Sequence, residues 1–160
     1  MKTRVRVLFL CTANCFRSPM AEVLLRHRGG DRFESLSAGA HPAGYVHPIA
    51  LATLEQLGLD TTVLRSKSWD EFAEQQLDLV ITLCDAAAQE SCPVWLGSPP
   101  QVHWPLPDPA GVLGSDEEVL QFSLLVAGRL DGMIQQLVEM DWSGMSPAQR
   151  SGFLERVGCP

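Results

Sequence analysis

Short apolar runs alternate with amphipathic segments along this chain, and glycine, proline or polar clusters separate them. Continuous apolar runs are typical of buried parallel strands, whereas apolar residues spaced three or four apart indicate helices. The runs predict strands at residues 5–10, 33–38, 77–83 and 102–104. The amphipathic segments predict helices at 19–28 and 48–57, a helix beginning at 69–74, a long helix from 115 to about 140, and a weaker terminal helix at about 146–157.

This alternation of strands and helices predicts an α/β fold. Because parallel strands need crossover connections, we expect a single-domain three-layer sandwich with a central four-stranded parallel sheet and helices on both faces. The 160 residues suffice for one domain, so residues 1–160 are expected to form a single catalytic domain with its core at about 5–140. Ligands of such sheets bind at the carboxyl ends of the strands, where Cys11, Cys84 and Asp108 are expected.

The loop between the first strand and the first helix begins at Cys11 and ends at Arg17. Ser18 suits a helix N-cap, and Pro19 suits the first helical turn. Backbone N–H groups in such a loop form a nest for an oxyanion, and Arg17 adds a planar fork of donors. In this positive pocket the Cys11 thiolate is favoured, so the loop predicts nucleophilic attack on a phosphate-like centre. A structural cysteine beside an unrelated surface arginine is the alternative. The remaining members of the predicted oxyanion-binding loop are Thr12, Ala13, Asn14, Cys15, Phe16 and Ser18.

Whole-chain composition narrows the function classes. The net charge of −7 disfavours nucleic-acid binding, which needs clustered positive charge, and no apolar run reaches the length of a membrane span. The N-terminal residues lead directly into the first strand, so no signal peptide is expected. The five cysteines therefore indicate thiol chemistry in the cytoplasm rather than a disulfide framework.

A second pair of cysteines, Cys84 and Cys92, follows the third predicted strand. Two cysteines at this spacing, without a further cysteine or histidine pair, make a poor zinc site, and no bound metal is expected. Buried, inert thiols are one explanation for the pair. The other is a dithiol that exchanges a disulfide with Cys11, since each exchange step needs only a thiolate attacking sulfur. Cys11 at the same sheet edge favours the exchange.

Asp108 stands between Pro107 and Pro109, which hold its loop in a restricted, extended form. A carboxylic acid on a rigid loop at the pocket mouth can protonate a leaving oxygen. An ordinary Asp-Pro turn gives the same pattern. Spacing alone leaves both interpretations open.

Taken together, these motifs resemble the low-molecular-weight protein tyrosine phosphatase superfamily, and within it the thioredoxin-coupled arsenate reductases. The superfamily features are the loop at 11–18, the turn at 37–39 and the Asp-Pro pair at 108–109. The features of the arsenate reductase branch are residues 82–84, the Cys-Pro pair at 92–93, and the segments 66–72 and 103–110. The resemblance extends over about residues 5–140.

The resemblance implies an arsenate reductase with no bound cofactor. Cys11 would attack arsenate held by the loop and Arg17, while Asp108 protonates the departing oxygen. Cys84 would then attack the Cys11 sulfur, releasing arsenite, and Cys92 would attack Cys84. An external thiol reductant, either thioredoxin or glutaredoxin with glutathione, would reduce the resulting disulfide. Phosphate or sulfate would mimic arsenate in the loop.

Three positions differ from the pattern of the superfamily. Ala110 replaces the tyrosine that stacks on aromatic substrates in the phosphatases, which favours a small inorganic oxyanion. Cys15 replaces a serine, and it either fills the serine's space or forms a disulfide with Cys11. Phe16 either narrows the pocket rim or packs outward. Ser18 is expected to hydrogen-bond the Cys11 thiolate.

Two other functions remain open on the sequence. A phosphatase would use the same Cys11, Arg17 and Asp108, with water hydrolysing phospho-Cys11, and Cys84 and Cys92 would be incidental. A non-catalytic sensor of oxyanions or redox state would use the cysteine pair as a switch for partner binding.

Overall fold

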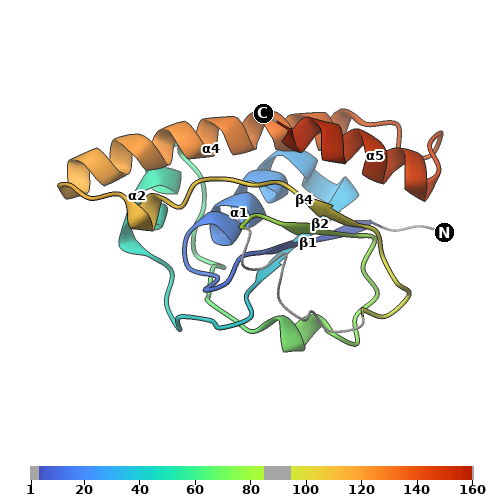
Figure 1. Cartoon of the computed structure of the whole chain (residues 1–160), viewed down its shortest axis with the longest axis horizontal. Helices are drawn as coiled ribbons and strands as arrows, with labels where there is room; N and C mark the ends of the chain where they lie inside the picture. Colours follow the sequence, from blue (N-terminus) through green and yellow to red (C-terminus); the bar gives the residue numbers. More distant parts are fainter. Residues whose placement is uncertain (1–3, 85–94, 160) are drawn as a thin grey trace.

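Four parallel strands form the centre of the computed structural model, which describes residues 4–84 and 95–159. The strands are β1 (Val5–Leu10), β2 (Phe33–Ala38), β3 (Leu79–Thr82) and β4 (Gln101–His103). They lie in the order β2-β1-β3-β4, and every neighbouring pair is parallel (Figure 1). The predicted four-stranded parallel sheet is confirmed, although β3 is shorter at both ends than the predicted 77–83. Because β1 is an inner strand, the loop that follows it begins in the middle of the sheet edge.

The α-helices within the described residues pack on one face of this sheet. They are α1 (Arg17–Gly29), α2 (Pro48–Gln56), α4 (Asp116–Glu139) and α5 (Pro147–Gly158). Figure 1 shows α4 and α5 crossing one side of the molecule, with α1 between α4 and the sheet. Alternate strand residues such as Val7, Phe9 and Ile81 point into this core and are fully buried. The period of two along the strands therefore places a large apolar core under α1 and α4.

The two C-terminal helices begin where their sequence signals predict. The Ser115 side chain accepts a hydrogen bond from the Glu118 N–H, and the Glu118 carboxylate accepts one from the Ser115 N–H. Ser146 and Gln149 form the same reciprocal cap at the start of α5. Such capping boxes satisfy N–H groups that the first helical turn leaves without partners. The two residues of each capping box are only three positions apart in the chain, so the helix starts are predictable from the sequence.

The opposite face of the sheet is covered by the short 3₁₀-helix η2 (Trp69–Phe72) and by Trp95. Trp69 and Phe72 are three residues apart, so a 3₁₀ turn places both rings on the same side, against Leu8 and Leu10. A helix begins at Trp69, as predicted for 69–74, but it is a single 3₁₀ turn that ends at Phe72. Within residues 4–84 and 95–159, no helix is long and apolar enough to cross a membrane.

Candidate active site

The loop from Cys11 to Phe16 connects the end of β1 to the start of α1. Its carbonyl groups are bound from outside by the segment after β2. The carbonyl oxygens of Thr12, Ala13 and Cys15 accept hydrogen bonds from three N–H groups of that segment, at 2.7–2.9 Å. Asn14 has a left-handed backbone with φ of 46°. A left-handed residue in a short loop turns successive N–H groups to one side, which is the backbone geometry that the predicted oxyanion nest requires.

Gly39, the residue after β2, lies in close contact with the backbone of this loop. A Cβ atom at Gly39 would lie 2.5 Å from the Thr12 carbonyl oxygen and 2.7 Å from the Cys11 carbonyl oxygen. Gly39 also forms two backbone hydrogen bonds with the segment around Ser68, donating to the Lys67 carbonyl and accepting from the Trp69 N–H. The loop can therefore approach β2 this closely only where the chain has no side chain.

Replacing Gly39 by alanine should lower the free energy of unfolding by about 1–3 kcal/mol, because the added methyl group would lie within 2.5–2.9 Å of backbone atoms of the loop. Urea denaturation followed by circular dichroism measures the change. Gly128→Ala is the matched control: Gly128 lies in α4, and a Cβ there meets no atom within 4 Å. Its stability should stay equal or rise slightly, because alanine favours helix. Equal stabilities of the two variants would contradict the close approach at Gly39.

Cys11 is almost fully buried, and its sulfur lies 2.9 Å from the Ser18 hydroxyl. The Asn14 amide donates a 2.7 Å hydrogen bond to that same hydroxyl oxygen. Since the hydroxyl oxygen already accepts from Asn14, its own proton is free to point at sulfur, which stabilises a thiolate. The expected hydrogen bond between Ser18 and Cys11 is confirmed. The expectation that Ser18 caps α1 is wrong: the N-cap position is Phe16, and Ser18 lies inside the helix with its side chain turned to the thiol.

Arg17 and Asp108 meet at the mouth of the loop. Arg17 Nη1 donates a 2.9 Å hydrogen bond to the Leu106 carbonyl, and Nη2 lies 3.5 Å from Asp108 Oδ2. The other Asp108 oxygen accepts from the Ala110 N–H and begins the 3₁₀-helix η3 (Pro109–Gly111). Asp108 is therefore both an Asp-Pro turn and a half-exposed acid facing Arg17, so the two interpretations of the sequence are compatible.

Cys84 comes to the same place from the end of β3. It is buried in a small cluster with Cys11, and its sulfur lies 3.4 Å from the Thr12 hydroxyl. Cys11, Cys84 and Asp108 thus meet at the carboxyl edge of the sheet, as expected for parallel strands. Cys92, the other half of the predicted dithiol, lies outside the described residues. Within residues 4–84 and 95–159, no group of three histidine, cysteine or acidic side chains is placed to hold a metal ion.

Phe16 lies in neither of the two places that the sequence left open. It is buried in the main core, so it neither narrows the pocket rim nor packs outward. Its ring lies 4.8 Å from the His47 ring, whose Nδ1 accepts a hydrogen bond from the Ile49 N–H at the start of α2. His47 therefore connects the loop to α2, a contact that sequence spacing does not reveal.

Cys15 is half-buried and packs against the main core. Burial raises the pKa of its thiol to about 11, and the neighbouring Cys11 and Asp108 add to the rise. A protonated thiol is a poor nucleophile, which supports the interpretation of Cys15 as a small side chain filling space.

At pH 8, iodoacetamide should therefore alkylate Cys15 about 10²-fold more slowly than an ordinary thiol, since only the thiolate reacts. Fragmentation of the tryptic peptide 7–17 in a mass spectrometer separates Cys15 from Cys11. The exposed Cys159 provides the reference rate. The labelling rate of Cys15 should rise about tenfold per pH unit and level off only near pH 11, and a rate within tenfold of Cys159 at pH 8 would count against the raised pKa.

Lys67 is a buried residue that sequence reasoning did not single out for a role. Its backbone N–H donates a 2.9 Å hydrogen bond to Asn14 Oδ1, and its ammonium group faces Glu22 and Ser37. The only signal for Lys67 is its place in the segment 66–72 that follows the resemblance.

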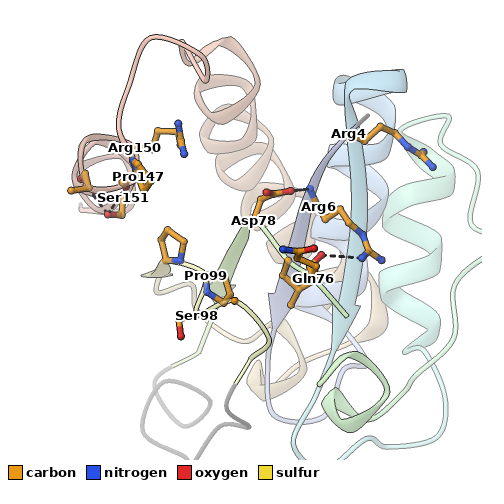
Figure 2. A pocket seen from close by; sticks show the side chains of 13 residues that line it. Arg4, Arg6, Gln76, Asp78, Ser98, Pro99, Pro147, Arg150 and Ser151 are labelled. Carbon is orange, nitrogen blue, oxygen red and sulfur yellow. Dashed lines mark hydrogen bonds between the residues drawn. The ribbon is translucent and has the colours of Figure 1, made fainter. Parts of the chain in front are cut away.

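A separate cavity of about 770 Å³ lies at the other end of the sheet (Figure 2). Its lining includes Arg6 and Arg150. Arg6 bonds to the Gln76 carbonyl and to Glu34, and Arg150 bonds to two backbone carbonyls near Trp142. None of the predicted site residues that the structure describes lines this cavity, because they lie at the carboxyl edge of the sheet instead.

A buried thiol in an oxyanion nest, with an arginine and a carboxylic acid at its mouth, defines a class of enzymes that attack tetrahedral oxyanions through cysteine. The sequence profile of the low molecular weight phosphotyrosine protein phosphatase family matches residues 6–140. The chain belongs to this family.

Relatives in this family include several arsenate reductases. The arsenate reductase of Halalkalibacterium halodurans is 39% identical over 112 residues, which cover 70% of this chain and 79% of the relative. A thioredoxin-dependent arsenate reductase of Corynebacterium glutamicum superposes with a TM-score of 0.63 at 28% identity, over 85% of this chain and 61% of that longer one. An arsenate reductase in the phosphate binding state gives a TM-score of 0.69 at 29% identity, over 84% and 96% of the two chains.

Proposed function

We propose that this protein is an arsenate reductase, which reduces arsenate to arsenite through a Cys11 arseno-thiol intermediate. The observation that carries the proposal is the burial of a second thiol, Cys84, in one cluster with the nucleophile Cys11. Hydrolysis of a phosphate ester needs one thiol and water, whereas reduction needs a second thiol that can reach the first sulfur. The named arsenate reductases among the relatives support the same function.

The first step forms a bond between Cys11 sulfur and arsenic. The loop N–H groups and the Arg17 fork hold the arsenate oxygens, and the Ser18 hydroxyl, 2.9 Å away, is placed to donate a hydrogen bond to the attacking sulfur. As sulfur attacks, Asp108 gives its proton to the departing oxygen, which leaves as water. The half-exposed position of Asp108 beside Arg17 suits this role, because the acid can regain a proton from solvent.

The second step transfers two electrons to arsenic. The Cys84 thiolate attacks Cys11 sulfur, the sulfur–arsenic bond breaks, and its electron pair stays on arsenic, which leaves as arsenite. Cys11 and Cys84 are then joined as a disulfide. The Thr12 hydroxyl, 3.4 Å from Cys84 sulfur, is placed to donate a hydrogen bond to the attacking thiolate.

The last step restores Cys11. The Cys92 thiolate attacks Cys84 sulfur, releases the Cys11 thiolate and leaves a Cys84–Cys92 disulfide. An external dithiol of the thioredoxin type then reduces this disulfide, and glutaredoxin with glutathione is the second candidate. The thioredoxin-dependent relative favours the first reductant. Use of these reductants places the reaction in the cytoplasm.

Two other functions make different predictions in one assay. A phosphatase would hydrolyse an aryl phosphate through the same Cys11, Arg17 and Asp108, and the family to which the chain belongs favours this alternative. Ala110, where phosphatases of this superfamily carry tyrosine, favours an inorganic oxyanion instead. A non-catalytic sensor of oxyanions or redox state would bind partners without turnover.

The test supplies arsenate, thioredoxin, thioredoxin reductase and NADPH, and follows NADPH absorbance. Oxidation that depends on both arsenate and this protein is the expected result, with glutaredoxin and glutathione run in parallel. Aryl phosphate hydrolysis without arsenate-dependent oxidation would select the phosphatase. Binding of arsenate without either reaction would leave the sensor.

A further inference from the structure

A buried ion pair lies beneath the loop that carries Cys11. Lys67 is 7% exposed and Glu22 is 4% exposed. The Lys67 ammonium lies 3.4 Å from Glu22 Oε1 and 3.4 Å from the Ser37 hydroxyl, and it donates a 3.0 Å hydrogen bond to the Arg65 carbonyl. Ser37 in turn donates to the same Glu22 oxygen. Charges this deep are costly unless each has partners, and here both charged groups have them.

The backbone of Lys67 is connected to Cys11 through three consecutive contacts. The Lys67 backbone N–H holds Asn14 Oδ1, the Asn14 amide donates to Ser18, and Ser18 lies 2.9 Å from the Cys11 sulfur. Glu22 approaches from the other side, because it lies in α1 one turn after Ser18. Both members of the ion pair are therefore attached to elements that carry the thiolate.

Glu22 has a second cationic partner besides Lys67. Its second oxygen accepts a 2.8 Å hydrogen bond from the half-exposed Arg26, which remains when Lys67 is changed. Burial lowers the pKa of Lys67, and Glu22 opposes that shift. Arg65 and Glu71 form the remaining charged pair nearby, at the surface. The titratable groups on the loop side are Cys15, Cys84, Arg17 and Asp108.

We propose that Lys67 is a positioning residue for Cys11: its ammonium group balances Glu22, and this balance keeps the Cys11 thiolate available at neutral pH. Without Lys67, the Glu22 carboxylate would keep only Arg26 as a cationic partner, and its negative charge in a low-dielectric interior would repel the thiolate more strongly. Without Glu22, the ammonium would be uncompensated and would attract the thiolate. The inference rests on the proposed role of Cys11 as nucleophile.

The test measures the rate of Cys11 alkylation by iodoacetamide against pH, read from the tryptic peptide 7–17. Lys67→Met should raise the pH midpoint of the rate profile by about one unit, and Glu22→Gln should lower it by about the same amount. The double variant Glu22→Gln/Lys67→Met, which is neutral again, should return the midpoint to that of the wild type. A purely structural ion pair would lower thermal stability in both single variants without opposite shifts.

Arg65→Met is the matched control, because it removes the same charge two residues away, in a surface pair with Glu71. Its midpoint should move by less than about 0.2 unit, since solvent screens exposed charges. Unchanged midpoints, or shifts of the same sign in Lys67→Met and Glu22→Gln, would overturn the inference, and Glu22→Gln alone decides if Lys67→Met does not fold. Alkylation needs no arsenate, so a protein that fails to reduce arsenate still gives a clear answer here.

Discussion

Replacing Cys84 by serine is expected to abolish steady-state reduction of arsenate, with a loss of about 10⁴-fold or more in kcat, because a hydroxyl group cannot attack sulfur and carry the electron pair. The arsenic would stay bound to Cys11 or be released unchanged. Any hydrolysis of an aryl phosphate that the wild type shows should persist, since that reaction would use Cys11, Arg17, Asp108 and water without Cys84. NADPH oxidation coupled to thioredoxin measures the first activity, and release of the aryl alcohol measures the second.

Cys159→Ser is the control for this experiment. Cys159 is exposed near the chain end, and its sulfur contacts only the Glu155 carbonyl of α5 among the hydrogen bonds of the described residues. Loss of this thiol should leave arsenate turnover at the wild-type rate. If Cys84→Ser also reduces arsenate at that rate, the electrons do not pass through Cys84, and the proposed relay is wrong.

Replacing Arg17 by lysine is expected to lower kcat/KM for arsenate by about 10²–10³-fold, although the charge is kept. A guanidinium group offers two parallel donors in one plane, which a single ammonium group cannot reproduce. Arg17 is also held in place by the Leu106 carbonyl and Asp108, and a lysine would lose these contacts. Initial rates over a range of arsenate concentrations measure the change.

Arg28→Lys is the matched control, because Arg28 makes a two-pronged contact with Asp131 at the surface, away from the loop. Its kcat/KM should stay within about twofold of the wild type, as is usual for a surface ion pair. A similar small effect for Arg17→Lys would mean that the loop N–H groups alone bind and orient the oxyanion.

The strands, the long helix and the oxyanion loop were predictable because their signals are local. The capping box of Ser115 and Glu118 lies within three residues, and the loop from Cys11 to Arg17 is contiguous in the chain. Continuous apolar runs were enough to place the central strands β1 and β3, because these strands are largely buried on both faces. The short length of the helix that begins at Trp69 was not predictable, because the sheet face that the helix covers sets this length.

Several site details depended on contacts between distant parts of the chain. Lys67 and Asn14 are separated by 53 positions, and Arg17 reaches Leu106 across 89. The sequence left open whether Phe16 narrows the pocket rim or packs outward, because spacing cannot tell which side of a curved loop faces the core. The structure places it against His47, where it packs α2 to the loop.

By itself, the sequence determined that Cys11 lies in a loop between a strand and a helix, because backbone geometry over a few residues decides this. It also predicted that this loop binds an oxyanion. The tertiary structure decided that Cys84 lies in one buried cluster with Cys11, and that Ser18 turns inward to the thiol rather than capping the helix. It also decided that a buried ion pair of Lys67 and Glu22 supports the loop. These features arise from packing between elements, and packing joins residues that the order of the chain keeps apart.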